Sequence, residues 1–166
     1  MPVKEGWAGR FFDDFTVGDI YRSRIGRTIS DADNTQFTLL TNNTNQIHFN
    51  EHYARGTEFG RTLVNSAFTL AIVAGLAVVD TSEAGFALGW DEVTLPNPLF
   101  AGDTLYAESE VLETRASRSR PGWGIVKVRQ RGIKQDGTVV LVMTRSFMVP
   151  TRTAAGTREH FPEPKA

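Results

Sequence analysis

The sequence predicts an α+β domain in which an antiparallel sheet wraps around one apolar helix. Three segments in the second half alternate between apolar and polar residues, which is the pattern of antiparallel strands with one buried face. The segment from Asn65 to about Val79 is apolar around most of its circumference when wound into a helix, which indicates a helix surrounded by protein. Helices first and a strand meander afterwards favour the α+β class.

The first predicted helix begins after Ser30. This serine precedes two aspartates in a capping-box-like arrangement, and Phe37 and Leu40 supply an apolar stripe along the helix. We expect the helix to end near Thr41, where an asparagine-rich turn begins.

A second, short helix is expected directly after His48. Asn50 can cap it, residues 51–54 form its body, and Gly56 is well placed for its C-terminal exit. Because this helix follows His48 at once, it would fix the position of the imidazole.

Three strands are predicted, at residues 105–111, 124–134 and 138–149. Asp136-Gly137, between the last two, is a strong two-residue hairpin signal. Residues 96–98, Pro-Asn-Pro, and the Gly102-Asp103 pair mark the chain before the first strand as turn-rich.

Length and composition indicate a single soluble domain. A chain of 166 residues with 40% hydrophobic and 22% charged residues can form one core. We expect the domain over residues 1–150 and a loosely ordered tail over residues 151–166. The formal net charge of -1 offers no basic surface for nucleic acid or an acidic membrane.

The residue types that are missing narrow the chemistry further. The sequence has no cysteine, which excludes disulfides, thiolate nucleophiles and cysteine-based zinc sites. The first residues lack the apolar core of a signal peptide, and the longest apolar stretch is too short to span a bilayer. A cytoplasmic protein is therefore expected.

Residues 43–50, Asn-Thr-Asn-Gln-Ile-His-Phe-Asn, place an imidazole among carboxamides shortly before the apolar helix. The segment resembles the signature Asp-x-Asn-Pro-x-His-x-Asp of the MaoC-like (R)-specific enoyl-CoA hydratases and dehydratases, a hot-dog-fold family. The resemblance covers roughly Phe11 to Pro150, and three further segments carry it: residues 12–19, 63–66 and 98–105.

The resemblance implies a hot-dog fold, an antiparallel β-sheet wrapped around a central apolar helix. It implies a homodimer or higher homo-oligomer with the ligand tunnel at the interface. A monomer would expose sheet edges and a wide apolar face, which also favours oligomers on physical grounds.

The activity implied by the resemblance is reversible hydration of a short-chain 2-enoyl-CoA to a 3-hydroxyacyl-CoA. Coenzyme A is then the substrate carrier, and no metal or redox cofactor is expected. The sequence of residues 41–50 and 119–126 most resembles the branch of the family that acts on branched or dicarboxylic acyl-CoAs, such as mesaconyl- or itaconyl-CoA.

In the resembled family an aspartate and a histidine share the proton transfers. Asn43 occupies the aspartate position here, and an amide cannot act as a base, so His48 is expected to be the only titrating catalyst. Asn43 would hydrogen-bond the water or the thioester-side oxygen. The backbone N–H of Ser66, where the family usually has glycine, would stabilise the enolate oxygen. A second departure is Ala74, where some members have a supporting serine.

Two further asparagines are expected near the substrate: Asn45, which would orient His48 or its loop, and Asn65 at the helix start. The alternative is that His48, Asn43 and Asn45 are only turn residues, because asparagine tolerates left-handed backbone and bonds its own backbone. His52 lies one helical turn beyond His48, but no acidic cluster accompanies the pair, so a surface role is favoured over metal binding.

Arginines supply the remaining substrate-binding candidates. Arg118 and Arg120 form a small basic loop between strands that could bind the phosphates of CoA, although a solvated hairpin loop is the alternative. Arg61, together with Arg55, could meet a carboxylate on the acyl group.

Two rival functions remain open. A hot-dog acyl-CoA thioesterase would use the same helix-start amide but needs a water-activating residue near the thioester carbon. In a non-catalytic acyl-CoA-binding or structural subunit, Asn43 would mark the loss of the catalytic aspartate.

Overall fold

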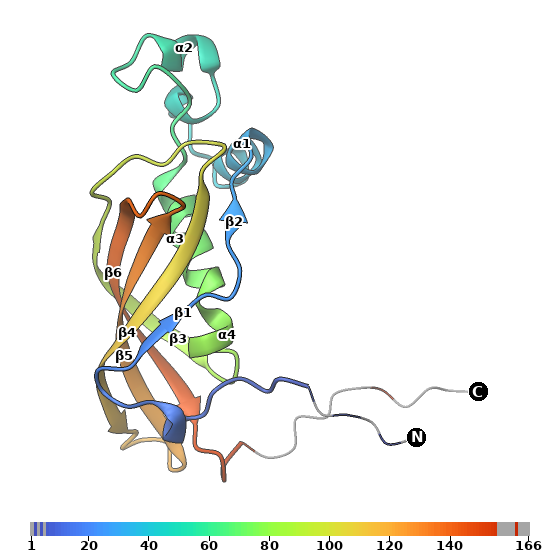
Figure 1. Ribbon diagram of the computed structural model, residues 1–166, viewed down its shortest axis with the longest axis vertical. Helices are drawn as coiled ribbons and strands as arrows, with labels where there is room; N and C mark the ends of the chain where they lie inside the picture. Colours follow the sequence, from blue (N-terminus) through green and yellow to red (C-terminus); the bar gives the residue numbers. More distant parts are fainter. Residues whose placement is uncertain (1, 3, 5, 156–161, 163–166) are drawn as a thin grey trace.

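The computed structural model describes residues 2, 4, 6–155 and 162. Its core is one antiparallel sheet with the strand order β1-β4-β5-β6-β3, and β2 also pairs with β4 (Figure 1). The strands are β1 Ile20–Arg22, β2 Arg27–Thr28, β3 Phe86–Thr94, β4 Thr104–Ala116, β5 Trp123–Lys134 and β6 Val139–Pro150. The helices are η1 Phe12–Asp14, α1 Asp31–Leu40, η2 Gln46–His48, α2 Glu51–Arg55, α3 Ser66–Leu76 and α4 Val78–Thr81.

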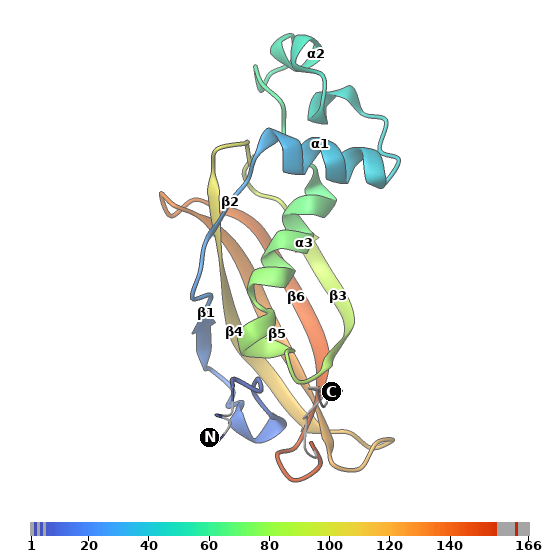
Figure 2. The same ribbon diagram turned by 90° about the vertical axis from the view of Figure 1, so that its right-hand side faces the viewer.

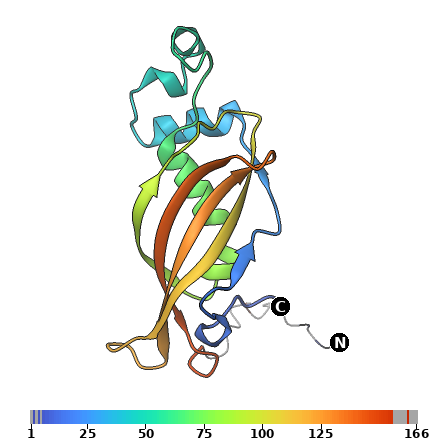
Figure 3. The ribbon, with the colours of Figure 1, turned by 60° about the vertical axis from the view of Figure 1, so that its left-hand side comes forward.

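Helix α3 lies diagonally across one face of the sheet (Figure 2), and the opposite face is turned to the viewer in Figure 3, with α3 behind it. Phe68 and Val73 of α3 pack against inward-facing residues of the strands, among them Leu105, Leu141 and Met143. The predicted arrangement of a sheet around an apolar helix is therefore confirmed.

Helix α3 is less enclosed than expected. It ends at Leu76, short of the predicted Val79, and a turn at Ala77 leads into the short α4. Its small residues Ala67, Ala71 and Gly75 are exposed. The prediction that protein surrounds the whole helix is thus wrong for a single chain, in which one stripe of the helix stays uncovered.

The capping signals of α1 are confirmed. Ser30 is the N-cap, and its side chain and that of Asp33 form the predicted capping box. The predicted apolar stripe is confirmed at Phe37, which stacks on Phe68 with a centroid distance of 4.9 Å. It is wrong at Leu40, which is 82% exposed. The buried positions of α1 are instead the polar residues Asn34 and Thr38, which face the candidate site.

The remaining local predictions hold where turn chemistry is strong. Asn50 caps α2 and Gly56 ends it. The predicted β5–β6 hairpin is present, but its loop covers residues 135–138 and is therefore longer than the predicted two-residue turn; Gly137, with φ of 89°, donates its N–H to the carbonyl oxygen of Lys134 at 2.9 Å. The sequence did not predict β1, β2 or β3.

The segment directly after β6 contacts η1 near the start of the chain. After β6, residues 151–155 form a turn in which the N–H of Arg152 donates to Asp13 Oδ2 at 2.7 Å and its guanidinium pairs with Asp14 of η1 at 2.6 Å. Residues 156–161 and 163–166 of the predicted tail lie outside the described residues. Among the helices that the structure does describe, none is long and apolar enough to cross a membrane.

Candidate active site

His48 is held in one orientation by the chain segment that leads into α3. The residue ends the 3-10 helix η2, is buried, and its ring atom Nδ1 lies 2.8 Å from the carbonyl oxygen of Leu63. A carbonyl oxygen can only accept, so Nδ1 carries the hydrogen. In the neutral ring Nε2 then presents a lone pair that can take a proton, which is the tautomer that a general base requires.

Asn34 joins the three segments of the site. This residue of α1 is 1% exposed, and its Nδ2 donates to the carbonyl oxygens of His48 at 2.8 Å and Leu63 at 3.1 Å. Its Oδ1 accepts the backbone N–H of Asn65 at 2.9 Å. One amide group thereby fixes the histidine turn to the start of the central helix.

The start of α3 presents a donor. Asn65 is its N-cap, with Oδ1 accepting the N–H of Ala67 at 2.9 Å and Nδ2 donating to Thr38 Oγ1 at 3.2 Å. The N–H of Ser66, the first residue of the helix, has no hydrogen-bond partner among the described residues. A first-turn amide that points away from the helix, with the positive end of the helix dipole, can bind a developing oxyanion.

A pocket of about 200 Å³ adjoins this amide. Ser66 and Thr69 of α3 line one side, and residues 95–99, which follow β3, line another. Leu63, whose carbonyl oxygen holds the imidazole of His48, is also part of the lining. The pocket, the amide and the histidine are thus connected through residues 63–66.

Asn43 and Asn45 shape the turn in front of His48. Asn43 Oδ1 accepts the N–H of Asn45 at 3.0 Å, and Asn45 Oδ1 accepts the N–H of Ile47 at 3.2 Å as the cap of η2. The Nδ2 groups of both asparagines are without a hydrogen-bond partner in the described part of the chain. Asn43 can therefore bend the turn with its oxygen and still offer a donor.

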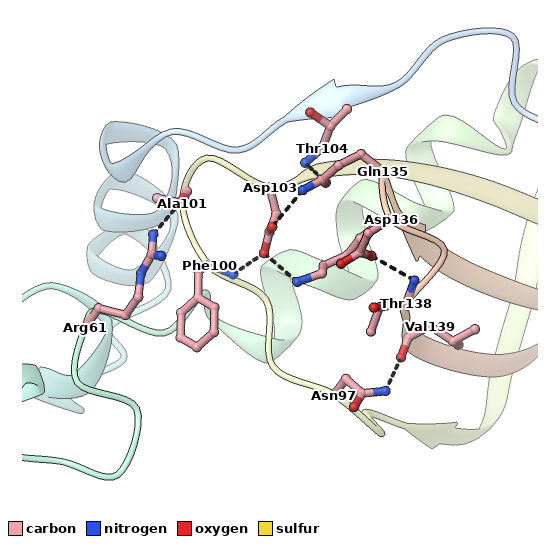
Figure 4. Close-up of polar contacts among 11 residues, drawn as sticks. Arg61, Asn97, Phe100, Ala101, Asp103, Thr104, Gln135, Asp136, Thr138 and Val139 are labelled. Atoms are coloured by element: carbon pink, nitrogen blue, oxygen red, sulfur yellow. Dashed lines mark hydrogen bonds and ion pairs between the residues drawn. The ribbon is translucent and has the colours of Figure 1, made fainter.

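The loop of residues 98–103, which begins in the pocket lining, is fastened from two sides (Figure 4). Arg61 donates to the carbonyl oxygen of Ala101 at 2.7 Å, and its guanidinium carbon lies 4.8 Å from the ring centre of Phe100. Asp103 accepts the N–H of Phe100 at 3.1 Å and also binds Lys134 at 3.2 Å, which belongs to the end of β5.

The charge of Asp103 is stabilised by these contacts. Burial acts to raise the pKa of its carboxyl group, but hydrogen bonds from Gln135, Phe100 and Lys134 outweigh it and hold the pKa below its ordinary value. The ionised carboxylate ties the loop of residues 98–103 to the β5–β6 hairpin.

The other predicted site residues are more dispersed. Asn65 caps α3 with Oδ1 and binds Thr38 of α1 with Nδ2, so its observed contacts are those of a structural residue. Arg55 forms an exposed ion pair with Glu51 at 3.1 Å. Arg118 and Arg120 lie in the β4–β5 turn, at the opposite end of the sheet from α1 and α2 (Figure 1), and do not join His48 within one chain.

Sequence reasoning missed the two residues of α1 that support the site. Asn34 and Thr38 are buried polar residues four positions apart, so they lie on the same face of the helix. Two polar residues on the inner face of a helix are a signal that could have been noticed, because such groups are buried only when they are hydrogen-bonded.

The sequence is similar to those of known proteins. A family model described as mesaconyl-CoA hydratase matches residues 3–161. The mesaconyl-CoA hydratase of Haloarcula marismortui is 33% identical over 151 residues, which are 90% of this chain and 42% of that protein. The 3-hydroxybutyryl-CoA dehydratase of Methylorubrum extorquens is 30% identical over 112 residues, 66% of this chain and 69% of that protein.

Solved structures share the fold. The MaoC-like dehydratase from Rhodospirillum rubrum has a TM-score of 0.77 at 30% identity, over 87% of this chain and 99% of the other. A Mycobacterium tuberculosis protein described as having a double hotdog fold has a TM-score of 0.77 at 21% identity, over 94% of this chain and 47% of the other.

The expected resemblance to MaoC-like proteins and the hot-dog fold are confirmed by these matches. The chain spans less than half the length of the mesaconyl-CoA hydratases that it matches. A match over almost the whole sequence, a hot-dog sheet around α3 and a histidine fixed at the start of that helix place the chain in the mesaconyl-CoA hydratase family, among the MaoC-like dehydratases.

Proposed function

We propose that this chain catalyses the reversible addition of water to a short-chain 2-enoyl-CoA, giving a 3-hydroxyacyl-CoA. The observation that carries the proposal is the contact of His48 Nδ1 with the carbonyl oxygen of Leu63, three residues before Ser66, whose N–H has no hydrogen-bond partner in the part of the chain that the structure describes. This contact holds the proposed base against the short segment that carries the proposed oxyanion donor, and Leu63 and Ser66 of that segment line a pocket.

In the hydration direction, Nε2 of His48 takes a proton from water while the water oxygen bonds to the β-carbon. The electrons of the carbon–carbon double bond move toward the thioester, and the resulting enolate oxygen is stabilised by the N–H of Ser66. The imidazolium of His48 then gives its proton to the α-carbon, so that one water is added and the base is regenerated. This cycle needs no metal or redox cofactor.

Asn43 is proposed to hold the water. Its Nδ2 is the donor left over after Oδ1 has bent the turn, and a donor to the water oxygen leaves the water hydrogens directed toward other acceptors such as Nε2. Asn45 is proposed to position His48, because its backbone oxygen accepts the N–H of His48 at 3.3 Å and its side chain caps η2.

For the substrate we propose a branched or dicarboxylic acyl group of the mesaconyl type, carried by CoA. The pocket beside Ser66 is small and its lining is largely apolar, which suits a short acyl chain. Arg61 is held against the loop after this lining by Ala101 and Phe100, where a guanidinium can reach a second carboxylate.

We further propose that two copies of the chain pair through β3. Among the described strands this nine-residue strand pairs only with β6, and it carries large apolar residues with exposed side chains, namely Phe86, Leu88, Trp90 and Val93. A long apolar edge strand is a template for pairing with another strand. The double hotdog fold of the Mycobacterium tuberculosis protein shows that two such units can lie in one molecule.

The activity is tested by following the loss of enoyl-thioester absorbance with crotonyl-, mesaconyl- and itaconyl-CoA, with a thiol reagent in parallel. Wild-type protein should consume the enoyl thioester without releasing thiol, and mesaconyl-CoA should be the best of the three. Thiol release would instead identify a thioesterase, and absence of any change would leave a non-catalytic binding subunit.

The pairing is tested by measuring molar mass in solution with light scattering. Wild-type protein should have the mass of a dimer or a multiple of it, and the double variant Leu88→Glu/Trp90→Glu should be monomeric. Ile25→Glu is the matched control, because Ile25 is 68% exposed but lies between β1 and β2, at the other edge of the sheet. A monomeric wild type would refute the pairing.

A further inference from the structure

One side of the pocket beside Ser66 is a short segment that lies outside the sheet ladder. Residues 95–98, Leu-Pro-Asn-Pro, follow β3, are exposed in a single chain and contribute to the pocket lining. We call them the proline wall. Pro96 and Pro98 have no N–H, so the segment cannot extend the pairing of β3 with β6. In the described part of the chain, the backbone groups of the proline wall have no hydrogen-bond partner.

The side chain of Asn97 ties the proline wall to the sheet. Its Nδ2 donates to the carbonyl oxygen of Val139, the first residue of β6, at 2.8 Å (Figure 4). Val140, the next residue of β6, is fully buried and lines the same pocket. The hydrogen bond of Asn97 therefore joins two sides of the pocket directly and fixes the space between them.

Both ends of the proline wall are held independently of Asn97. Before it, Thr94 ends β3 and pairs with Val142 of β6. After it, the carbonyl oxygen of Leu99 accepts the N–H of Val64 at 2.9 Å. The two prolines restrict the backbone between these points. Loss of the Asn97 contact can thus let the middle of the wall move away from β6 while its ends stay in place.

The pocket is short and largely apolar. Its volume of about 200 Å³ lies below the range of about 300–1,000 Å³ that is usual for ligand sites. Thr69 of α3 and Val140 of β6, on two of its sides, are buried in the domain. The exposed proline wall is therefore the side that can yield most easily to a longer chain.

We propose that Asn97 is a specificity-determining residue, which limits the length of the acyl group by holding the proline wall against β6. The inference rests on the proposed function, because it takes the pocket beside Ser66 as the site of the acyl chain. A longer acyl group enters only when the hydrogen bond between Asn97 and Val139 breaks and the wall moves outward. The net contribution of one such hydrogen bond limits this discrimination to a factor on the order of 10.

Binding of saturated acyl-CoA thioesters tests the proposal without turnover. Titration calorimetry gives the dissociation constants of butyryl-CoA and hexanoyl-CoA for wild-type protein and for Asn97→Ala. The variant should improve the affinity for hexanoyl-CoA relative to butyryl-CoA by about 3- to 10-fold. An unchanged ratio of the two dissociation constants would overturn the assignment.

The Asn97→Asp variant separates the hydrogen bond from the volume of the side chain. Aspartate is as large as asparagine, but at pH 7 its ionised carboxylate cannot donate to the carbonyl oxygen of Val139. We expect the same shift of the ratio as in Asn97→Ala. A shift in the alanine variant alone would show that the lost volume is the cause and would refute the role of the hydrogen bond.

Thr94→Ala is the matched control. Oγ1 of Thr94 donates to the carbonyl oxygen of Val142 at 3.4 Å, so this residue also binds a carbonyl of β6, but it lies outside the pocket lining. The ratio should stay at the wild-type value, and circular dichroism checks that all variants fold. A shift equal to that of the Asn97 variants would mean a general loosening after β3 and would contradict the proposal.

Turnover gives a second measure. The ratio of kcat/KM for 2-hexenoyl-CoA to that for crotonyl-CoA should rise in Asn97→Ala by the same factor as the binding ratio. The kcat for crotonyl-CoA should stay close to wild type, because His48 and Ser66 are untouched. A loss of kcat with both substrates and no change of their ratio would show a merely structural role for Asn97.

The proposed reaction and the role of Asn97 fail separately. A protein that hydrates crotonyl-CoA, and whose Asn97 variants keep the wild-type ratio, would keep the reaction and remove the inference. A shifted binding ratio in a protein that hydrates no enoyl thioester would refute the reaction and keep the role of Asn97. Binding of neither saturated thioester would refute both.

Discussion

The imidazole of His48 donates from Nδ1 to the carbonyl oxygen of Leu63 over 2.8 Å, so the tautomer of the ring is set by the chain that starts α3. The same carbonyl oxygen accepts Asn34 Nδ2 at 3.1 Å. The imidazole of His48, which we propose as the base, and the segment that leads to the Ser66 amide are therefore parts of one hydrogen-bonded unit, and disturbing either should be visible in turnover.

Replacing His48 by alanine should lower kcat for hydration by about 10²–10⁴-fold, because the proton acceptor is removed while the oxyanion donor remains. Enoyl-thioester absorbance measures the rate, and circular dichroism checks the fold. His52→Ala is the control, since His52 is an exposed residue of α2; it should keep wild-type rates. Full activity of the His48 variant would contradict the assignment of the base.

Replacing Asn34 by alanine should lower both stability and turnover. Three hydrogen bonds are lost and the carbonyl oxygens of His48 and Leu63 lose a buried donor, which should cost about 2–4 kcal/mol of unfolding free energy. Denaturant titration measures the loss. Gln36→Ala, on the exposed side of the same helix, should cost well under 1 kcal/mol.

The importance of Asn34 also shows where sequence reasoning ends. Helix caps, the β5–β6 hairpin and the strands β4–β6 follow from residues close to each other in sequence, and these predictions were right. The partners of Asn34 lie 14, 29 and 31 positions away. Nothing local identifies them, because they become neighbours only when α1 packs at the start of α3.

Strand β3 was missed for a different physical reason. Its pairing with β6 is interrupted between Ala87 and Gly89 and again between Asp91 and Thr94, and Glu92 has a φ of 53°. These irregularities break the period of two on which strand prediction depends. The strand is exposed in a single chain, so apolar residues do not mark one face of it as buried.

The Asn43→Asp variant should fold like the wild type. One carboxylate oxygen can still accept the N–H of Asn45, as Oδ1 of the amide does at 3.0 Å. The second oxygen replaces a donor by a titrating acceptor, so the pH dependence of kcat should change and activity should persist. A pH–rate profile of both proteins measures this. Activity that arises only in the variant, from an inactive wild type, would instead show that Asn43 marks lost chemistry.

Acid should destabilise the protein partly through Glu108. Hydrogen bonding from Arg22, opposed by burial and assisted by Arg131, holds the pKa of Glu108 below its ordinary value of 4.5. The folded state therefore binds this proton less readily than the unfolded state. The contribution of Glu108 is complete above about pH 4.5 and is lost as the pH falls through the lower pKa of the folded state.

Glu108→Gln should accordingly be less stable than wild type by about 1–3 kcal/mol at pH 7, and the difference should shrink at pH 3. Urea unfolding at both pH values measures it. Glu113→Gln provides the comparison, since Glu113 and its partner Arg115 are largely exposed and 3.9 Å apart. An equal difference at both pH values would show that the charge of Glu108 is not the cause.

The buried guanidinium of Arg145 allows a test of core electrostatics. Arg145 is 4% exposed and donates from Nη2 to Ser82 Oγ at 2.9 Å, while its Nε and Nη1 have no partner among the described residues. Burial lowers its pKa. Ser82→Ala should therefore cost about 1–3 kcal/mol, because it removes the acceptor from a buried cation.

Arg145→Met should be close to neutral or stabilising, because an apolar side chain of similar length has no charge to desolvate. In the double variant Ser82→Ala/Arg145→Met, the cost of the serine substitution should largely disappear, since alanine no longer faces a cation. Urea unfolding of the four proteins gives the coupling energy between the two residues. Additive effects in this cycle would mean that Ser82 stabilises the protein independently of Arg145.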